Sequence, residues 1–227
     1  MEARTLADLR GITRERLNDL GKSRPRWSDD AINRGLNEAE QQACLRARLL
    51  FDQVSAITVL PILANTPLYL LNPSIFDLDS VRDATTGERL SLAYEDQLYM
   101  QSSRWRTLTG TAAREYVTQV LPNERLQLLL TPIPSAVTTL QLAVYRTPIY
   151  AMEDDADEPE IAPRHHDGLV AWACYRCLSI RDVDGYDPVK AAEHQADFIK
   201  EFGILPDANV RRKLREHRRH TMVARDF

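Results

Sequence analysis

The spacing of apolar residues changes twice along this chain of 227 residues, and that order limits the folds open to it. Residues 1–52 carry apolar side chains at steps of three and four, which is typical of helices. Residues 53–152 alternate in short runs broken by prolines, which is typical of strands. Residues 161–227 return to helical spacing. Helices from both ends can pack together only if the β part is an insertion that returns close to its start. We therefore predict an α+β fold, in which N- and C-terminal helices form a bundle with an inserted antiparallel β domain.

The predicted organisation has three parts. Residues 1–52 and 161–227 form a helical body that ends in a basic C-terminal tail, and residues 53–152 form the inserted β domain. Residues 153–160 have the sequence EDDADEPE and join the two as an acidic linker. Such a run of like charges is typical of a solvated connection.

Two helices are predicted before the β part. The first begins after the N-cap Thr5, with Asp8 near the positive end of the helix dipole, and Gly21 fits the left-handed position after its end. The second runs from Ser28 to Phe51 and has a charged outer face. Ser28 caps it, and Trp27 precedes the cap at the spacing of a hydrophobic staple with Ile32. The apolar face of this second helix comprises Ile32, Leu36, Ala39, Ala43, Ala47 and Leu50.

Three further helices are predicted after the linker. Gly168 to Ile180 is apolar almost all round, which indicates a buried helix. Asp187 and Pro188 are an N-cap and first-residue pair for the next helix. The apolar stripe of that helix comprises Val189, Ala192, Ala196 and Ile199, and Gly203 ends it. A last helix is predicted from Asp207 to Arg219. Within the β part, a short helix is predicted from Tyr94 to Arg104.

Overall composition excludes several classes of protein. The net charge of -4 argues against bulk binding of nucleic acid, which favours a basic domain. The N-terminal residues lack the apolar segment of a secretory signal, and no stretch qualifies as a membrane span. Three cysteines, an odd number, do not make a disulfide framework, so we expect a protein made in a reducing cytoplasm.

Motifs of catalysis and metal binding are weak in this sequence. It contains no GxSxG, HExxH or dinucleotide-binding glycine pattern, so we predict that the protein is not an enzyme and uses no cofactor. Cys174 and Cys177, with His165 and His166 upstream, are a candidate metal site. Both cysteines lie in the most apolar predicted helix, where free cysteines behave as small core residues, and we favour that interpretation.

The segment RRKLREHRRHT is strongly basic although the protein as a whole is acidic. Its positively charged residues are Arg211, Arg212, Lys213, Arg215, Arg218 and Arg219. The negative end of a helix dipole accounts for two or three such charges, not for six. We interpret the cluster as a docking site for an anionic surface. We favour an acidic patch on a partner protein over nucleic acid, and a solvated helix end with no specific target also stays open.

Several short motifs are distributed over most of the chain. The most specific are Arg26-Trp-Ser-Asp-Asp, which caps a helix, and Leu36-Asn-Glu-Ala-Glu in the core of that helix. Others are Thr5-Leu-x-x-Leu-Arg, Leu130-Thr-Pro-x-Pro134, Pro159-Glu-Ile-x-Pro163 and His166-x-x-Leu169. Together they resemble the head-to-tail adaptor, or connector, proteins of tailed bacteriophages. Thr111-Ala-Ala113 stands where that family has a proline, which affects the expected local β geometry.

The resemblance implies a structural virion protein at the head–tail junction, made in the host cytoplasm and without a membrane partner. Such proteins form a homo-oligomeric ring, typically a dodecamer, below the portal protein. The ring extends the channel for DNA ejection, through which packaged DNA passes without sequence-specific binding, and a tail or nozzle protein docks on it. The C-terminal segment often reaches the portal, so Arg211 to Arg219 are expected to bind it. The alternative is a nucleic-acid-binding regulatory protein that uses the same basic segment.

Overall fold

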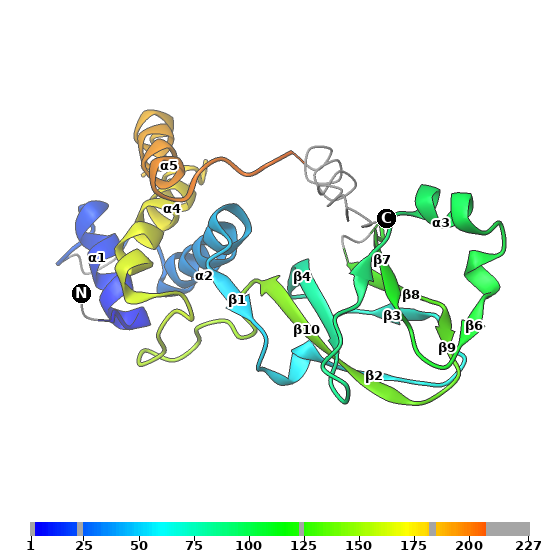
Figure 1. Ribbon diagram of the computed structural model, residues 1–227. Coiled ribbons are helices and arrows are strands. Elements are labelled where there is room, and N and C mark those ends of the chain that lie inside the picture. Colours follow the sequence, from blue (N-terminus) through cyan, green and yellow to red (C-terminus); the bar gives the residue numbers. More distant parts are fainter. Residues whose placement is uncertain (1–2, 22–24, 123–124, 182–184, 208–227) are drawn as a thin grey trace.

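The strands and one short helix lie at one end of the molecule, and the longer helices lie at the other (Figure 1). This computed structural model describes residues 3–21, 25–122, 125–181 and 185–207. Within them the chain forms five α-helices and sheets that are mainly antiparallel, which confirms the predicted α+β class. The basic segment from Arg211 to Arg219 and nearly all of the predicted last helix lie outside the described residues.

Four helices come together in the helical part: α1 (Leu6–Arg16), α2 (Asp29–Ala47), α4 (His166–Leu178) and α5 (Pro188–Phe202). Helix α4 contacts the other three, and most of its side chains are buried, as its composition predicts. It approaches α2 closely, since a Cβ atom on Gly35 would lie 3.1 Å from Ala173 Cα. The two ends of the chain therefore share one apolar core and depend on each other for burial.

Side-chain caps mark where three of these helices begin, and the sequence predicts each of them. Thr5 Oγ1 accepts the Asp8 N–H at 3.3 Å, and Asp8 Oδ2 accepts the Thr5 N–H at 3.1 Å, which completes a capping box. Ser28 Oγ accepts the Ala31 N–H at 3.2 Å. Asp187 Oδ1 accepts two amides in the first turn of α5 at 3.1 and 3.2 Å. Each cap stabilises its helix by about 1 kcal/mol.

Helices α1 and α2 end earlier than their apolar spacing predicts. Helix α1 ends at Arg16, because Asn18 adopts a left-handed backbone with φ 52° ahead of the predicted stop. Helix α2 ends at Ala47 rather than Phe51, because Arg48 is left-handed with φ 53° and the chain continues as a strand. In both places a residue other than glycine takes the helix-ending conformation, which apolar spacing does not reveal.

Helix α5 turns a different face to the core than its predicted apolar stripe. Ala191, Phe198 and Phe202 are the buried residues, whereas Val189 is 68% exposed. The ring of Phe198 packs against Trp172 of α4 with centroids 4.9 Å apart. Burying two phenylalanines removes more apolar area from water than burying a valine and alanines. The aromatic face therefore packs against α4.

Two sheets and a short strand pair form the β part. In the first sheet, β10 (Thr138–Arg146) pairs along one edge with β4 (Ile75–Asp83) and along the other with β1 (Leu50–Asp52) and β2 (Val59–Ile62). The second sheet has the order β3 (Leu68–Leu70), β8 (Leu126–Thr131), β7 (Glu115–Val120) and β5 (Ser91–Leu92). The short pair is β6 (Thr109–Gly110) with β9 (Ile133–Pro134).

The inner faces of the two sheets bury a second core. Alternate residues of β10 are buried, as its pattern predicts, and so are alternate residues of β8. They are Leu140, Leu142 and Val144 of β10 and Leu126, Leu128 and Leu130 of β8. Helix α3 (Glu95–Gln101), within the predicted short helix, lies against β7 and β8, where Leu98 and Trp105 pack with Val117 and Leu129.

Strand β1 begins directly after α2, and its partner β10 is the last strand before the chain returns to the helices. Leu50 pairs with Arg146 and Asp52 with Val144, so the β part starts and ends at adjacent positions. The predicted division at residues 52 and 53 passes through this point, and the independence of the two parts as domains stays a prediction.

Trp27 ties the start of α2 to the end of α4. Its indole Nε1 donates to the Cys177 carbonyl at 3.0 Å, and the side chain is 2% exposed. The ring occupies the space that a Cβ atom on Gly185 would need. Trp27 and Ile32, the predicted staple residues, are both buried in the same core.

We expect Trp27→Ala to lower the free energy of unfolding by about 3 kcal/mol, because it leaves a cavity and an unpaired carbonyl. Trp27→Phe keeps most of the packing and removes only the hydrogen bond, so it should cost about 1 kcal/mol. Urea unfolding followed by circular dichroism measures both. Equal stability of the alanine variant and the unchanged protein would contradict this placement of Trp27.

Candidate functional site at the junction of the two halves

The basic residues predicted to bind a partner, Arg211, Arg212, Lys213, Arg215, Arg218 and Arg219, all lie outside the described residues. Within the described chain, a group of largely buried charges lies where the helical part meets the β part. Two connectors cross this junction, one from α2 to β1 and one from β10 to α4. Their contacts decide how the two halves are oriented.

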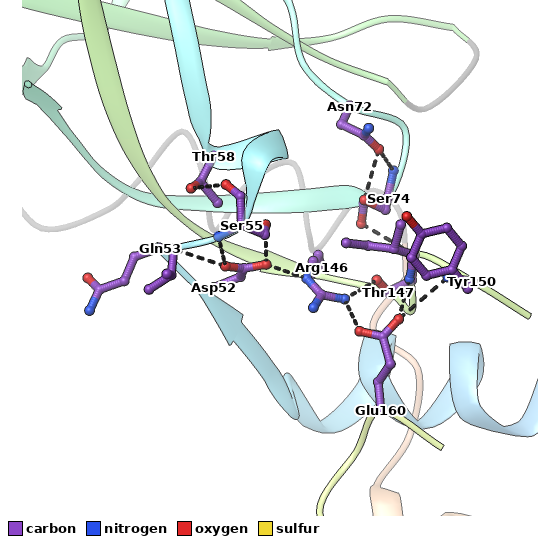
Figure 2. Close-up of polar contacts among 12 residues, drawn as sticks. Asp52, Gln53, Ser55, Thr58, Asn72, Ser74, Arg146, Thr147, Tyr150 and Glu160 are labelled. Carbon is purple, nitrogen blue, oxygen red and sulfur yellow. Dashed lines mark hydrogen bonds and ion pairs between the residues drawn. The ribbon is translucent and has the colours of Figure 1, made fainter. Parts of the chain in front are cut away.

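Arg146, the last residue of β10, binds Asp52 at the end of β1 and Glu160 of the second connector (Figure 2). Its Nε donates to Asp52 Oδ2 at 2.6 Å, and its Nη1 donates to Glu160 Oε2 at 2.6 Å. The side chains of Arg146 and Asp52 are only 12% and 9% exposed, so solvent screens this pair little. Burial by itself would lower the pKa of Arg146, but the hydrogen bonds to both carboxylates outweigh it and raise that pKa.

The Asp52 carboxylate accepts four hydrogen bonds. Besides Arg146, its donors are the Val54 N–H at 3.0 Å, the Ser55 N–H at 3.1 Å and the Ser55 hydroxyl at 2.6 Å. Burial would raise the pKa of Asp52, but the bonds from Ser55, Val54 and Arg146 together hold it well below its ordinary value. Asp52 therefore stays charged at neutral pH and fixes the turn that follows β1.

Glu160 binds both the last residue of β10 and the start of the second connector. While one of its oxygens binds Arg146, the other accepts the Ile149 N–H at 2.6 Å (Figure 2). The beginning and the end of the connector are therefore held by one carboxylate.

Two side chains of α2 hold the second connector against the helix. Asn37 donates to the Met152 carbonyl at 3.0 Å and accepts the Met152 N–H at 2.8 Å. Glu40 is 1% exposed and accepts the Ile161 N–H at 3.3 Å. Burial raises the pKa of Glu40 to about 7, although the backbone N–H groups of Ile161 and Glu160 and the charge of Arg146 oppose that shift.

Arg48 makes a further link across the junction. Its Nη2 lies 2.8 Å from Asp77 Oδ2 on β4, and its guanidinium lies 5.2 Å from the ring centroid of Tyr145 on β10. These contacts compensate for the left-handed backbone of Arg48, which costs about 1–2 kcal/mol. The residue that ends α2 therefore also fixes the helix to the sheet.

The acidic segment 153–160 is attached to the start of α1. The Leu6 N–H donates to the Asp157 carbonyl at 2.7 Å, and the Ala7 N–H donates to the Asp155 carbonyl at 3.2 Å. Arg10 Nη2 also lies 2.7 Å from Asp155 Oδ1. Most side chains of segment 153–160 are exposed, as predicted. Its backbone carbonyls nevertheless accept hydrogen bonds from helix amides that would otherwise lack partners.

The cysteines and histidines of the candidate metal site are separated into different environments. Cys174 and Cys177 are buried in the helical core, and burial raises their pKa values to about 12 and about 11. His166 Nδ1 accepts the Arg4 N–H at 3.0 Å, and its Nε2 lies 2.9 Å from the Ile161 carbonyl. Among the described residues, no three His, Cys, Asp or Glu side chains form a group that could hold a metal ion.

Large apolar side chains are exposed on the β part. They are Leu63, Leu68, Leu70, Tyr99, Met100 and Leu108, and Met100 is 89% exposed. They belong to β3, α3 and the segments beside β2 and β6, all on the half of the molecule away from α1, α2, α4 and α5 (Figure 1). Among the described helices, none combines the length and apolar composition that a membrane span requires.

Sequence patterns alone do not reveal the junction residues. Arg146 lies 94 positions from Asp52 and 14 from Glu160, and no short motif joins them. The one local signal is Asp52 three positions before Ser55, a spacing at which carboxylates often accept backbone amides. Chemically, the arrangement can hold β1, β10 and the second connector at a fixed geometry, since its charges bind one another.

One protein-family model, described as SU10 adaptor protein, matches residues 4–224. The match covers both halves and the junction between them. No curated protein matches the chain.

We expect Arg146→Ala to lower the free energy of unfolding by about 3 kcal/mol, because it leaves the largely buried charge of Asp52 and the partly exposed charge of Glu160 without a counterion. Arg176→Ala is the matched control. Its ion pair with Glu38 spans 2.9 Å between side chains that are 51% and 34% exposed. It should cost less than about 1 kcal/mol. Urea unfolding of both variants measures the difference, and equal losses would show that the junction is no stronger than a surface pair.

We expect Glu40→Gln to remove part of the pH dependence of stability. Because burial raises the pKa of Glu40 from 4.5 to about 7, the folded state binds more protons between these values. The contribution of Glu40 to the free energy of unfolding is therefore complete below pH 4.5 and is lost as pH rises through 7. At pH 8 the variant should be more stable than the unchanged protein by about 3 kcal/mol, and near pH 4 the two should agree. Melting curves across this range test it, and a difference that is independent of pH would contradict it.

Proposed function

The chain belongs to the SU10 adaptor protein family, and from this membership we propose that it is a structural subunit of the ring that joins phage head to tail. The ring would sit below the portal protein, extend the DNA channel and receive the tail or nozzle protein. In this proposal the protein acts by its shape and contact surfaces and catalyses no reaction.

The junction around Arg146 carries the proposal. A closed ring forms only when each subunit presents its two different contact surfaces at one fixed angle. Here Arg146 binds Asp52 of β1 and Glu160 of the second connector, and that connector is also held to α2 by Asn37 and Glu40. The subunit therefore resembles a wedge whose two ends keep a constant relation, which is what a ring around an axis requires.

We assign the two ends to different partners. The helical part faces the portal and the neighbouring subunits, with the charged outer face of α2 as one side of the subunit contact. The β part faces the tail. Its exposed leucines and Met100 support that assignment, because apolar side chains contribute binding free energy when a partner removes them from water.

The charge of the chain suits a DNA channel. The net charge of -4 keeps the ring from holding the phosphates of passing DNA. The basic segment from Arg211 to Arg219 is then free for the portal, where arginine can bind carboxylates through paired hydrogen bonds.

Imaging of a reconstituted complex tests the proposal. The full chain is mixed with the portal protein of the same phage and examined by negative-stain electron microscopy. We expect a ring of added density on one face of the portal. Portal particles that gain no density at any mixing ratio would refute the adaptor role. Binding of duplex DNA with a steep salt dependence would favour the regulatory alternative.

We expect truncation after Asn209 to weaken attachment to the portal by about tenfold or more, because the six basic residues of the segment and Arg225 are lost while the described helices and strands are retained. A full-length variant with the same six residues changed to glutamine is the matched control for chain length. Pull-down and thermal melting of both measure attachment and folding. Undiminished attachment of both variants would contradict a role for this segment.

A further inference from the structure

Helix α5 has a second apolar face that is exposed at Val189, Ala192, Ala196 and Gly203 and half-buried at Ile199. The helix lies on the outside of the helical part and contacts mainly α4 (Figure 1). Ala191, Phe198 and Phe202 make that contact, whereas Val189, Ala192 and Ala196 are exposed. The free face is next to the packed one on the same 15-residue helix.

The residues of this free face repeat at alternating steps of three and four. They are Val189, Ala192, Ala196, Ile199 and Gly203. This repeat is that of the a and d positions of a coiled coil, where one helix packs lengthwise on another. The alanines and the glycine would allow the second helix to approach closely, and the valine and isoleucine supply apolar area.

The charges beside this face identify the helix that fits it. Glu193 and Lys200 follow the two d positions and lie on one flank, seven residues apart. Both are exposed, and neither makes an ion pair within the described part of the chain. When two such helices lie antiparallel with Ala196 of one copy beside Ile199 of the other, each Glu193 faces the Lys200 of the second copy. Flanking pairs of this kind set the partner and the direction of helix packing.

We propose that the free protein binds a second copy of itself through this face of α5, with the two helices antiparallel across a two-fold axis. Such a contact is isologous, and a ring with one rotation axis does not contain it. The dimer is therefore a form of the chain outside the ring. It covers the apolar face of α5, and it does not depend on the proposed adaptor role.

The contact is expected to be weak and reversible. One helix of 15 residues offers a small area, and interfaces below about 1,200 Å² are typical of transient complexes. Reversibility suits a subunit that must be free to enter a larger assembly.

Sedimentation equilibrium of the full chain at increasing concentration tests the proposal. The mass should rise from 25.9 kDa toward twice that value. Glu193→Lys and Lys200→Glu should each weaken dimerisation by about tenfold, since each turns two attractive pairs into repulsive ones. The double variant, with both charges exchanged, should return to within about threefold of the unchanged protein.

Asp197→Lys is the matched control, because it makes the same change of charge as Glu193→Lys on the exposed surface of α5 away from the repeat. It should dimerise as the unchanged protein does, and thermal melts should show that all variants are folded. A protein that stays monomeric at every concentration would overturn the proposal. That result is expected if the C-terminal segment or another protein covers this face instead of a second copy. Equal weakening by Asp197→Lys, or a double variant no better than the single ones, would also overturn it.

Discussion

The bridge that Arg146 makes between Asp52 and Glu160 is the interaction on which the arrangement of this molecule depends. It joins the last strand of the β part to β1 and to the connector that leaves that part. Each half has an apolar core of its own, and Leu50 of β1, Met152 and Ile161 also pack into the helical core. Charges and hydrogen bonds at the junction add directional contacts to this apolar packing.

A charged junction suits the proposed role, in which the subunit would repeat around an axis. Buried ion pairs add little net stability compared with apolar contacts, because both charges lose their hydration. Their hydrogen-bond geometry, however, is directional, so they define one arrangement more sharply than apolar packing does. Arg48, Asn37 and Glu40 act in the same way around Arg146. The family to which the chain belongs, a phage adaptor family, makes a fixed geometry of this kind functionally meaningful.

The resemblance drawn from short motifs is confirmed by the family match over residues 4–224. The caps Thr5, Ser28 and Asp187 and the alternating faces of β8 and β10 are also where the sequence predicts them. The predicted apolar stripe of α5 is the informative exception. Its residues do repeat at helical spacing, but the face that is buried in the core is the neighbouring one, which carries Phe198 and Phe202. A helix with two apolar faces has two possible packings, and spacing alone does not choose between them.

Local patterns in the chain were enough to locate the helix starts, the alternating strands, the α+β class and the family. Each of these depends on residues within a few positions of one another, where capping and periodicity act directly. Folding in three dimensions decided the junction, the early ends of α1 and α2 and the face of α5 that is buried. Those outcomes depend on partners as far apart as Asp52 and Arg146, 94 positions along the chain. Whether two distant groups meet is set by the packing of whole elements, because no short-range preference links them.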